Sequence, residues 1–411
     1  PRPDGDGGSA SIGAGSGWED RGRRDSGVSR SSAERERVRS VRAGSLVILS
    51  LVAARAEAFY SLERERLSLE LSGTAKFFPL LTLSPSNALV DRDETVVGFG
   101  SLRINGELFL DSASLEVAYH LFPVAGEDVG VTDSSVGAAG PQGGLVAPVV
   151  SPLRLIDLDR ESSTSDDLVL LQNLDRLGVT LLGPGESEVR IGRQAINHGS
   201  ARVFSATDIF SPFSPATLDS EYKQGLDALR VTVPLDENQE VELFAIAVDR
   251  DLDNSFARGV YLARYRASVP EVFDASVYLG TSYASPTLGV DVSGDLGGAT
   301  WYAEGGVRVW NESVATDLVE ANDITVLPSD EYGTPVRATV GGQYFFPFEL
   351  DVAGELHWNG AGSTNREDYV ETFRRPEWTT GEIFLLGRAY VGTAWSYSSS
   401  ALTRLSLSTI T

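Results

Sequence analysis

Apolar and polar residues alternate with a period of two along most of the chain. In segment 348–359, for example, the apolar Leu350 and Leu356 alternate with the acidic Asp351 and Glu355. Consecutive side chains of a β-strand point to opposite faces of the sheet, so this period predicts strands with one apolar and one polar face. Helical periodicity is weak throughout these segments.

The alternation predicts about fifteen strands, and several of them reach 12 to 15 residues. A strand in a globular protein usually has about five or six residues, whereas a membrane-crossing strand needs about ten. The lengths therefore predict an all-β fold, an antiparallel transmembrane β-barrel. The predicted strands lie near residues 65–82, 95–110, 112–122, 167–182, 187–194, 222–234, 239–249, 257–268, 272–284, 286–296, 299–311, 334–346, 348–359, 383–396 and 400–411.

The connections between these strands alternate between short turns, such as 111–112 and 297–298, and long loops. Outer-membrane barrels have short periplasmic turns and long external loops. The rhythm therefore predicts a protein of the cell outer membrane, with membrane lipid and lipopolysaccharide as partners. One connection, 284–286, breaks the rhythm because it should be external and is short. The long predicted loops cover residues 83–94, 123–166, 195–221, 312–333 and 360–382.

The predicted strand number bears on the C-terminal end. Both ends of a bacterial barrel normally lie in the periplasm, which requires an even number of strands. The fifteenth strand runs outward and stops at Thr411. We therefore expect a C-terminally truncated barrel, with about fifteen of sixteen or eighteen strands and an open or strained seam between the first and the last.

The N-terminal region differs in composition from the rest of the chain. Residues 1–36 are rich in Gly, Ser, Asp and Arg, which indicates a disordered or non-native leader. Residues 37–58 combine a basic flank, an apolar run and an Ala-Glu-Ala exit, the three parts of a secretory signal peptide. The alternative is a short buried helix. A signal peptide predicts cleavage after Ala58 and a mature barrel of residues 59–411.

Charge and composition narrow the classes of function. The chain has 58 acidic and 34 basic residues and a formal net charge of −24, which argues against nucleic-acid binding. A soluble acidic protein would share this charge, but not the long alternating strands. Because the chain has no cysteine and only three scattered histidines, we expect no thiol nucleophile, no metal centre and no cofactor.

The stretch from Val189 to Arg230 is the most distinctive in the sequence. It contains Gly-Arg-Gln at a strand end, then Arg-Val-Phe and Asp-Ile-Phe-Ser-Pro-Phe in a loop, and Asp-Ala-Leu-Arg on the returning strand. In these motifs the chain resembles outer-membrane porins of the alginate-export and related families. The strand rhythm extends the resemblance over most of residues 60–411. The resemblance implies a passive channel with a loop that folds into the lumen.

Loop 195–221 also gives a physical reason for such a fold, because its apolar residues are interleaved with prolines. Apolar side chains flanked by prolines indicate a packed, fixed conformation. Packing against the inner wall would narrow the pore; the alternative is a cap on the barrel rim. The predicted constriction residues are Asp208, Ile209, Phe210, Pro212 and Phe213.

Alternation assigns a mixed set of charges to the inner face. An arginine that faces lipid costs roughly 2–4 kcal/mol at the bilayer midplane, so the lumen is the cheaper position. Opposed charges across a pore would set a transverse field for a solute; the alternative is that they pair with one another and hold the wall. The predicted pore-lining residues are Arg103, Arg176, Arg190, Arg230, Arg264, Arg266, Arg308, Arg337, Glu304, Glu349, Asp351 and Glu355.

Two other patterns suggest chemistry that the sequence does not complete. His198, Ser200 and Asp208 could supply a hydrolytic triad, but no Gly-x-Ser-x-Gly elbow accompanies them. Residues 249–254 resemble a calcium loop that lacks the glycine and the final glutamate of an EF-hand. We therefore expect no catalytic residues and no enzyme.

The leading hypothesis is a channel for passive diffusion of small hydrophilic or anionic solutes. A polysaccharide-export channel is an alternative, although an acidic polymer needs a strongly positive lumen and the charges here are mixed. A third hypothesis, from another class, is a non-conducting surface β-protein that binds a ligand. The sequence indicates no particular solute or oligomeric state.

Overall fold

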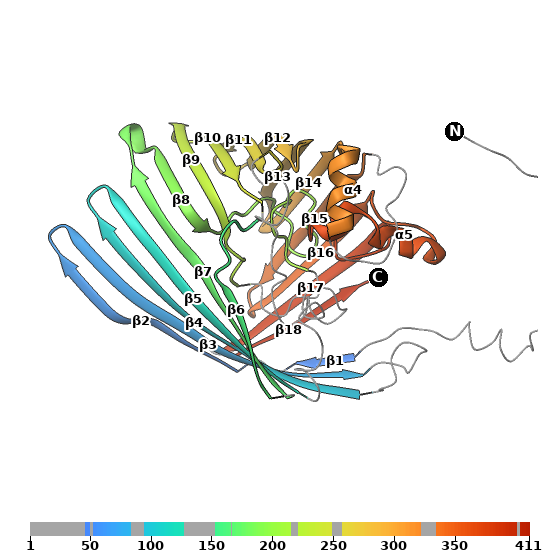
Figure 1. The fold of residues 1–411 in the computed structure, drawn as a ribbon, viewed down its shortest axis with the longest axis horizontal. Coiled ribbons are helices and arrows are strands. Elements are labelled where there is room, and N and C mark those ends of the chain that lie inside the picture. Colours follow the sequence, from blue (N-terminus) through green and yellow to red (C-terminus); the bar gives the residue numbers. More distant parts are fainter. Residues whose placement is uncertain are drawn as a thin grey trace, which may run out of the picture.

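A computed structural model describes residues 46–49, 52–83, 94–126, 153–165, 167–214, 221–248, 257–321, 334–400 and 403–411. Within them, antiparallel strands form one continuous sheet that curls around a central space (Figure 1). The predicted all-β antiparallel fold is confirmed.

The strands of the first half of the sheet are β1 (Leu46–Leu49), β2 (Val52–Arg64), β3 (Leu67–Leu83), β4 (Glu94–Leu110), β5 (Ala113–Gly126), β6 (Asp159–Ser165), β7 (Leu168–Leu182), β8 (Glu188–Gln194) and β9 (Leu226–Asp236). The second half contains β10 (Gln239–Ile246), β11 (Val260–Val269), β12 (Phe273–Ser282), β13 (Ser285–Leu296), β14 (Ala299–Arg308), β15 (Val336–Phe346), β16 (Leu350–Asn359), β17 (Ala389–Ser400) and β18 (Thr403–Ile410).

Two positions in the sheet are each filled by two strands that lie end to end. β1 and β2 both pair with β3. β6 and β8 pair with the same edge of β7, at Leu168–Asn173 and Leu177–Leu182 respectively, while β5 covers its other edge. The eighteen strands of the described residues therefore occupy sixteen positions. The prediction of about fifteen strands lacked three of the eighteen, because β6 is polar along its length and β1 and β2 overlap the predicted signal peptide.

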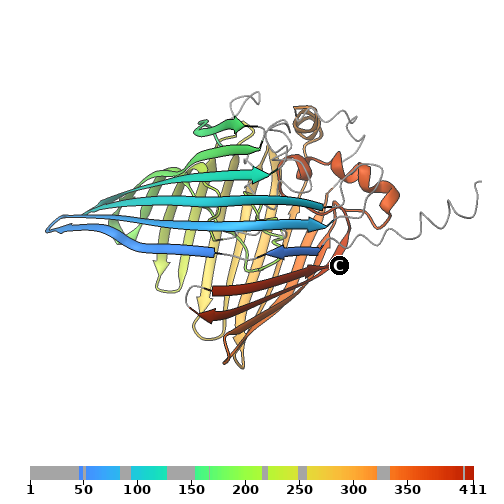
Figure 2. The same ribbon diagram turned by 90° about the horizontal axis from the view of Figure 1, so that it is seen from below.

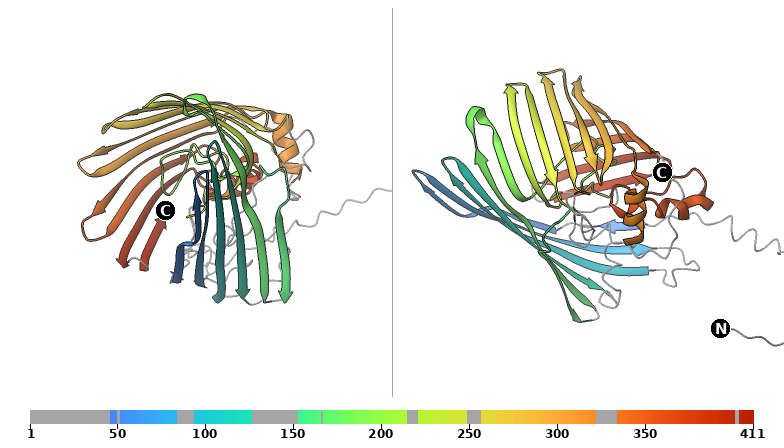
Figure 3. Two further views of the ribbon diagram at one scale, coloured as in Figure 1. Left: turned by 90° about the vertical axis from the view of Figure 1, so that its left-hand side faces the viewer. Right: turned by 45° about the horizontal axis from the view of Figure 1, so that its top comes forward.

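The two edges of the sheet, β2 and β18, approach each other (Figures 2 and 3). No backbone pairing joins β18 to β1 or β2 in the described part of the chain, so the sheet is not closed. The expected open seam is confirmed. β3 corresponds to the first predicted strand, whose outer edge was expected to lie at the seam. In the structure that edge pairs with β1 and β2. An unpaired strand edge readily pairs with an extended neighbour, which accounts for this pairing. Cleavage after Ala58, which would remove residues 1–58, remains a prediction.

Short helices occupy the predicted loops 312–333 and 360–382. They are α4 (Glu312–Ala321), η2 (Arg366–Asp368), α5 (Tyr369–Phe373) and α6 (Pro376–Thr379); a further one, η1 (Pro184–Glu186), lies in a turn. α4 has only ten residues, too few for a clear periodic signal, although Val314, Ala315 and Leu318 share its buried face. None of the helices in the described ranges is long and apolar enough to cross a membrane.

The sheet has a short-turn end, with turns such as 111–112, 237–238 and 297–298, and an opposite long-loop end where α4 and α5 gather (Figure 1). One tight turn lies at the long-loop end, between β12 and β13. Its central residues Tyr283 and Ala284 have positive φ values of 52° and 55°, which β-hairpins of this kind usually assign to Gly or Asn. This turn is the exception that the sequence showed at 284–286.

Most boundaries of the predicted strands lie within three residues of the observed ones; the larger differences are the end of β5, at Gly126 rather than 122, and two at β9 and β17. β9 begins at Leu226 rather than at residue 222, and β17 covers Ala389–Ser400 rather than 383–396. In both cases the residues that precede the strand leave the wall and contact other elements.

Candidate functional site

The sheet is apolar on its outside and charged on its inside. In β16, Leu356 is 57% exposed and the adjacent Glu355 is 2% exposed. In β10 the same holds for Leu243 (48%) and Glu242 (0%). A protein in water places these residue types the other way round. An outward apolar band with a polar interior is the arrangement of a barrel in lipid.

The twelve predicted pore-lining residues fall into three groups. Seven are buried on the inner side of the sheet: Arg103, Arg176, Arg264, Arg308, Arg337, Glu304 and Glu355. Arg190, Arg230 and Asp351 are partly exposed on β8, β9 and β16, and the Arg266 side chain is half-exposed on β11. Glu349 lies instead in the turn between β15 and β16, with a positive φ of 63°, and is exposed.

Each of the eight arginines in this set forms an ion pair with a carboxylate. Arg103 lies 2.7 Å from Asp175, and Arg337 lies 3.1 Å from Glu382. Such pairing compensates the desolvation of a buried charge. The partners are Asp175 for Arg103 and Arg176, Glu116 for Arg190, Glu242 for Arg230 and Arg264, Glu240 for Arg266, and Glu382 for Arg308 and Arg337.

Residues 195–214, which we call the lumenal segment, leave the wall after β8 and run along the inside of β12–β16. Their contacts are with residues in the middle of strands: Glu304 of β14, Thr339 of β15 and Glu355 of β16. Contacts at this depth are those of a segment inside the sheet rather than on its rim.

Glu304 holds two parts of the lumenal segment at once. The backbone N–H of Ser200 donates to its Oε2 (3.0 Å), as does the hydroxyl of Thr207 (3.0 Å). The backbone N–H of Ala206 donates to Oε1. A buried carboxylate needs such donors, since burial without them costs several kcal/mol.

Glu355 binds the turn between these two parts. The backbone N–H groups of Arg202 (2.6 Å) and Val203 (2.9 Å) donate to Oε1, and that of Phe204 (2.8 Å) donates to Oε2. The hydroxyl of Tyr302 also donates to Oε1 (2.7 Å). Both carboxylates of the wall therefore fix the segment through its backbone, a role that the side-chain pattern of the segment could not reveal.

The predicted constriction residues lie in the second part of the lumenal segment. Asp208, Ile209 and Phe210 are buried, whereas Pro212 and Phe213 are partly exposed. Ile209 and Phe210 belong to an apolar cluster inside the sheet, with Phe244 of β10 and Tyr278 of β12 among its members. The Tyr278 hydroxyl also donates to the carbonyl of Thr207 (2.9 Å).

The chain returns to β9 along the opposite wall. The Tyr222 hydroxyl lies 3.0 Å from that of Thr74 on β3, and the Arg103 guanidinium of β4 lies 4.4 Å from the centre of the Tyr222 ring. Glu221 pairs with Lys76 of β3 at 2.5 Å, and Lys223 pairs with Asp208. Residues 195–214 thus contact β14–β16, and residues 221–225 contact β3–β4 on the other side of the lumen.

The Gly-Arg-Gln and Asp-Ala-Leu-Arg motifs meet where β8 ends. Arg193 is 1% exposed and donates to both oxygens of Asp227 (2.8 and 3.0 Å). Asp227 also accepts the backbone N–H groups of Leu155 and Ile156 (both 2.9 Å). The motif pair therefore secures segment 153–158 in the part of the wall that the lumenal segment vacates. The sequence motifs singled out these residues but did not indicate that they fix segment 153–158.

His198 packs inside the lumenal segment, with ring centres 4.7 Å from Phe210 and 5.3 Å from both Phe244 and Tyr278. Burial, followed by the positive charges of Arg264 and Lys223, holds the pKa of His198 well below its ordinary value of 6.5. Burial likewise lowers the pKa of Lys223, while its partner Asp208 opposes the shift.

We expect acid to loosen the lumenal segment through His198. The packed state disfavours the proton, so its stability is intact above the ordinary pKa and declines as pH falls below about 6.5 toward the lowered value. The measurement is the mobility of a spin label attached at Arg202→Cys of the lumenal segment, compared between about pH 7 and 5. His198→Gln should remove the acid-dependent increase. An equal increase in wild type and variant would assign it to other groups.

The arrangement does not form a hydrolytic triad. Both ring nitrogens of His198 are buried and have no hydrogen-bond partner among the residues that the structure describes. The Ser200 hydroxyl donates to Asp291 (3.3 Å), and Asp208 pairs with Lys223. No group of three or more His, Asp or Glu residues that could hold a metal occurs in the described ranges. Residues 249–254, the imperfect calcium loop, lie outside those ranges.

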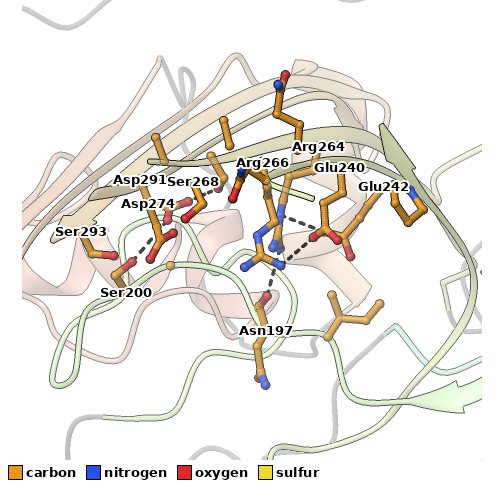
Figure 4. Close-up of a pocket in the computed structure, with 18 of the residues that line it drawn as sticks. Asn197, Ser200, Glu240, Glu242, Arg264, Arg266, Ser268, Asp274, Asp291 and Ser293 are labelled. Atoms are coloured by element: carbon orange, nitrogen blue, oxygen red, sulfur yellow. Dashed lines mark hydrogen bonds and ion pairs between the residues drawn. The ribbon is translucent and has the colours of Figure 1, made fainter. Parts of the chain in front are cut away.

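A cavity of about 740 Å³ lies between the lumenal segment and the short-turn end. Arg264 and Arg266 project into it from β11, Asp274 and Asp291 from β12 and β13, and Asn197 from the lumenal segment (Figure 4). Its remaining labelled lining residues are Ser200, Glu240, Glu242, Ser268 and Ser293. Most of the lining residues carry charged, hydroxyl or amide side chains, which suits a hydrated polar solute.

No protein-family model and no curated protein sequence matches the chain. The resemblance to the alginate-export and related families therefore remains a prediction. Among solved structures, the fold is similar to that of Salmonella typhi OmpF in complex with daunomycin, at 10% identity and a TM-score of 0.48, over 85% of this chain and 92% of that chain. It is also similar to Pseudomonas aeruginosa OccD3, at 10% identity and a TM-score of 0.41, over 87% and 88%. Pseudomonas putida OprB, in a high-pH structure, matches at 10% identity and a TM-score of 0.38, over 92% and 91%. These likenesses concern the fold alone.

Proposed function

We propose that the protein is an outer-membrane channel of the porin kind, through which small hydrophilic solutes diffuse passively. The observation that carries the proposal is that the sheet is apolar outside and charged inside. Leu243 and Leu356 are exposed on its outer face, and Glu242 and Glu355 are buried on its inner face. Lipid is the medium in which that surface is stable, because an apolar band in water is unfavourable and a lipid-facing charge is costly.

The lumenal contents favour small solutes over a polymer. Residues 195–214 and 221–225 lie in the lumen and are bound to its two sides, Tyr222 to Thr74 and Phe204 to Glu355. A polysaccharide-export channel needs an open positive path, whereas the predicted lumenal arginines all pair with carboxylates. We further expect the channel to admit small anions, and reversal potentials in a salt gradient measure this selectivity.

The test is ion conduction by the purified protein in a planar bilayer, with protein recovered from outer-membrane fractions. We expect stepwise currents, and a protein that migrates differently in detergent gels with and without heating. Reversal potentials in a salt gradient then give the ion selectivity. A heat-modifiable protein that never conducts would instead support the surface β-protein that binds a ligand.

A further inference from the structure

Two groups of charged side chains face each other across the 740 Å³ cavity, and the exposed Glu186, Asp236 and Glu237 line it at the short-turn end. On one side, Arg230 and Arg264 share the single carboxylate of Glu242, which is 0% exposed. Arg266 pairs with Glu240 at 2.6 Å. In this ion-pair cluster three guanidinium groups therefore face only two carboxylates.

The other side is acidic and has no cation of its own. Asp291 accepts hydrogen bonds from the hydroxyls of Ser276 and Ser200, the latter at 3.3 Å. Neither Asp291 nor Asp274 forms an ion pair with any residue that the structure describes. Two carboxylates therefore face the arginine side across the cavity (Figure 4).

Strand register fixes the distance between the two groups. Arg266 is paired with Ser276, and Ser276 with Asp291, so the three residues form one row across β11, β12 and β13. Neighbouring strands lie about 4.8 Å apart, which places the backbones of Arg266 and Asp291 about 10 Å apart. The residue between them is a serine, whose small side chain leaves the space open.

We propose that this cavity recognises small dipolar ions, molecules such as a dipeptide that carry both an ammonium group and a carboxylate. The proposal rests on the channel function proposed above. The ammonium group binds Asp274 and Asp291 with the surrounding serines, and the carboxylate binds the arginine side. A solute with a single charge satisfies only one side and leaves the other group hydrated by water alone.

The experiment compares three probes of similar size: alanylalanine, its C-terminal amide, and its N-acetyl derivative. Reversible block of the ion current gives a half-block concentration for each. We expect the value for alanylalanine to be about tenfold lower than that of either derivative, equivalent to about 1.4 kcal/mol. Equal values, or stronger block by either singly charged derivative, would overturn the proposal.

Substitutions assign the two ends. In Asp274→Asn with Asp291→Asn, block by alanylalanine and by the amide should weaken about tenfold, while block by the N-acetyl derivative stays constant. Arg266→Gln should weaken block by alanylalanine and by the N-acetyl derivative. The matched control is Asp295→Asn, an acidic residue of β13 that is bound by Thr300 (2.8 Å) outside the cavity.

Binding of the same probes to the protein in detergent is measured in parallel by calorimetry. If no current is observed, the channel function is refuted. The order of the three affinities then still shows whether the cavity prefers dipolar ions. If currents flow but the three probes bind alike, the channel function stands and the dipolar-ion site is refuted. Unchanged heat-modifiable migration of each variant shows that the fold is retained.

Discussion

Replacement of both Glu304 and Glu355 by glutamine is expected to release the lumenal segment and to raise the single-channel conductance several-fold. Each oxygen of these two carboxylates accepts at least one hydrogen bond from residues 200–207. Glutamine keeps the shape but replaces one acceptor oxygen by an NH₂ group. That NH₂ group faces N–H donors whichever way the amide is turned.

The expected size of the effect follows from the number of bonds lost. A hydrogen bond to a charged group contributes about 1.5–3 kcal/mol, and a buried donor left without an acceptor costs a similar amount. Glu355 alone accepts three backbone N–H groups, from Arg202, Val203 and Phe204. Loss at both sites is therefore comparable with the packing energy of Ile209 and Phe210, which is about 1.5–3 kcal/mol per side chain.

Two readouts test this prediction. One is the conductance, with Asp295→Asn as the control for loss of one acid from the wall. The other uses the absence of cysteine from the chain, since Arg202→Cys creates a single site for a spin label on the lumenal segment. A label that stays as immobile in the double variant as in the parent, at unchanged conductance, would show that apolar packing alone fixes the segment.

The wall could be predicted from sequence because a strand of period two decides which face each residue occupies. The alternation of Leu356 with Glu355 gave the correct side for both before any partner was known. Membrane crossing makes the strands long, so the signal repeats often enough to be read. β6 was missed because its sequence, Asp-Arg-Glu-Ser-Ser-Thr-Ser, has no apolar face.

The lumenal contacts could not be predicted in the same way. Phe204 and Glu355 are 151 positions apart, and only the strand register brings them together. The chemistry involved is also hidden, because the donors are backbone N–H groups that any residue carries. Arg193 and Asp227 were visible as motif residues, yet their joint role depends on segment 153–158, which carries no motif.

The sequence also did not indicate which charged residues of the wall form buried structural ion pairs and which ones border the cavity. Arg308 and Arg337 were grouped with Arg266 by their common face, but the first two are buried against Glu382 and the third borders the cavity. Face assignment follows from local geometry, whereas the partner of each charge depends on loops that fold back over the wall.

The buried carboxylate of Glu382 leads to the second large effect, at the long-loop end. Its side chain is 1% exposed and pairs with Arg308 of β14 and with Arg337 of β15 (3.1 Å). Arg337 also donates to the Glu382 carbonyl (3.1 Å), so these contacts dock segment 360–388 on the wall. Breaking a buried ion pair by removing one partner costs about 3–5 kcal/mol.

Glu382→Gln is therefore expected to let segment 360–388 undock while the sheet stays intact. Trypsin provides the measurement, because Arg366 is exposed in this segment and cleavage tracks the population of the opened form. A cost of about 3 kcal/mol corresponds to cleavage roughly a hundredfold faster. Glu371→Gln is the matched control, since Glu371 pairs only with Arg374 within the described part of the same loop. Cleavage at the same rate in both variants would contradict the prediction. Adding Arg308→Met and Arg337→Met to Glu382→Gln should restore resistance to trypsin. The triple variant no longer has the two positive charges that Glu382→Gln leaves buried without a counter-charge.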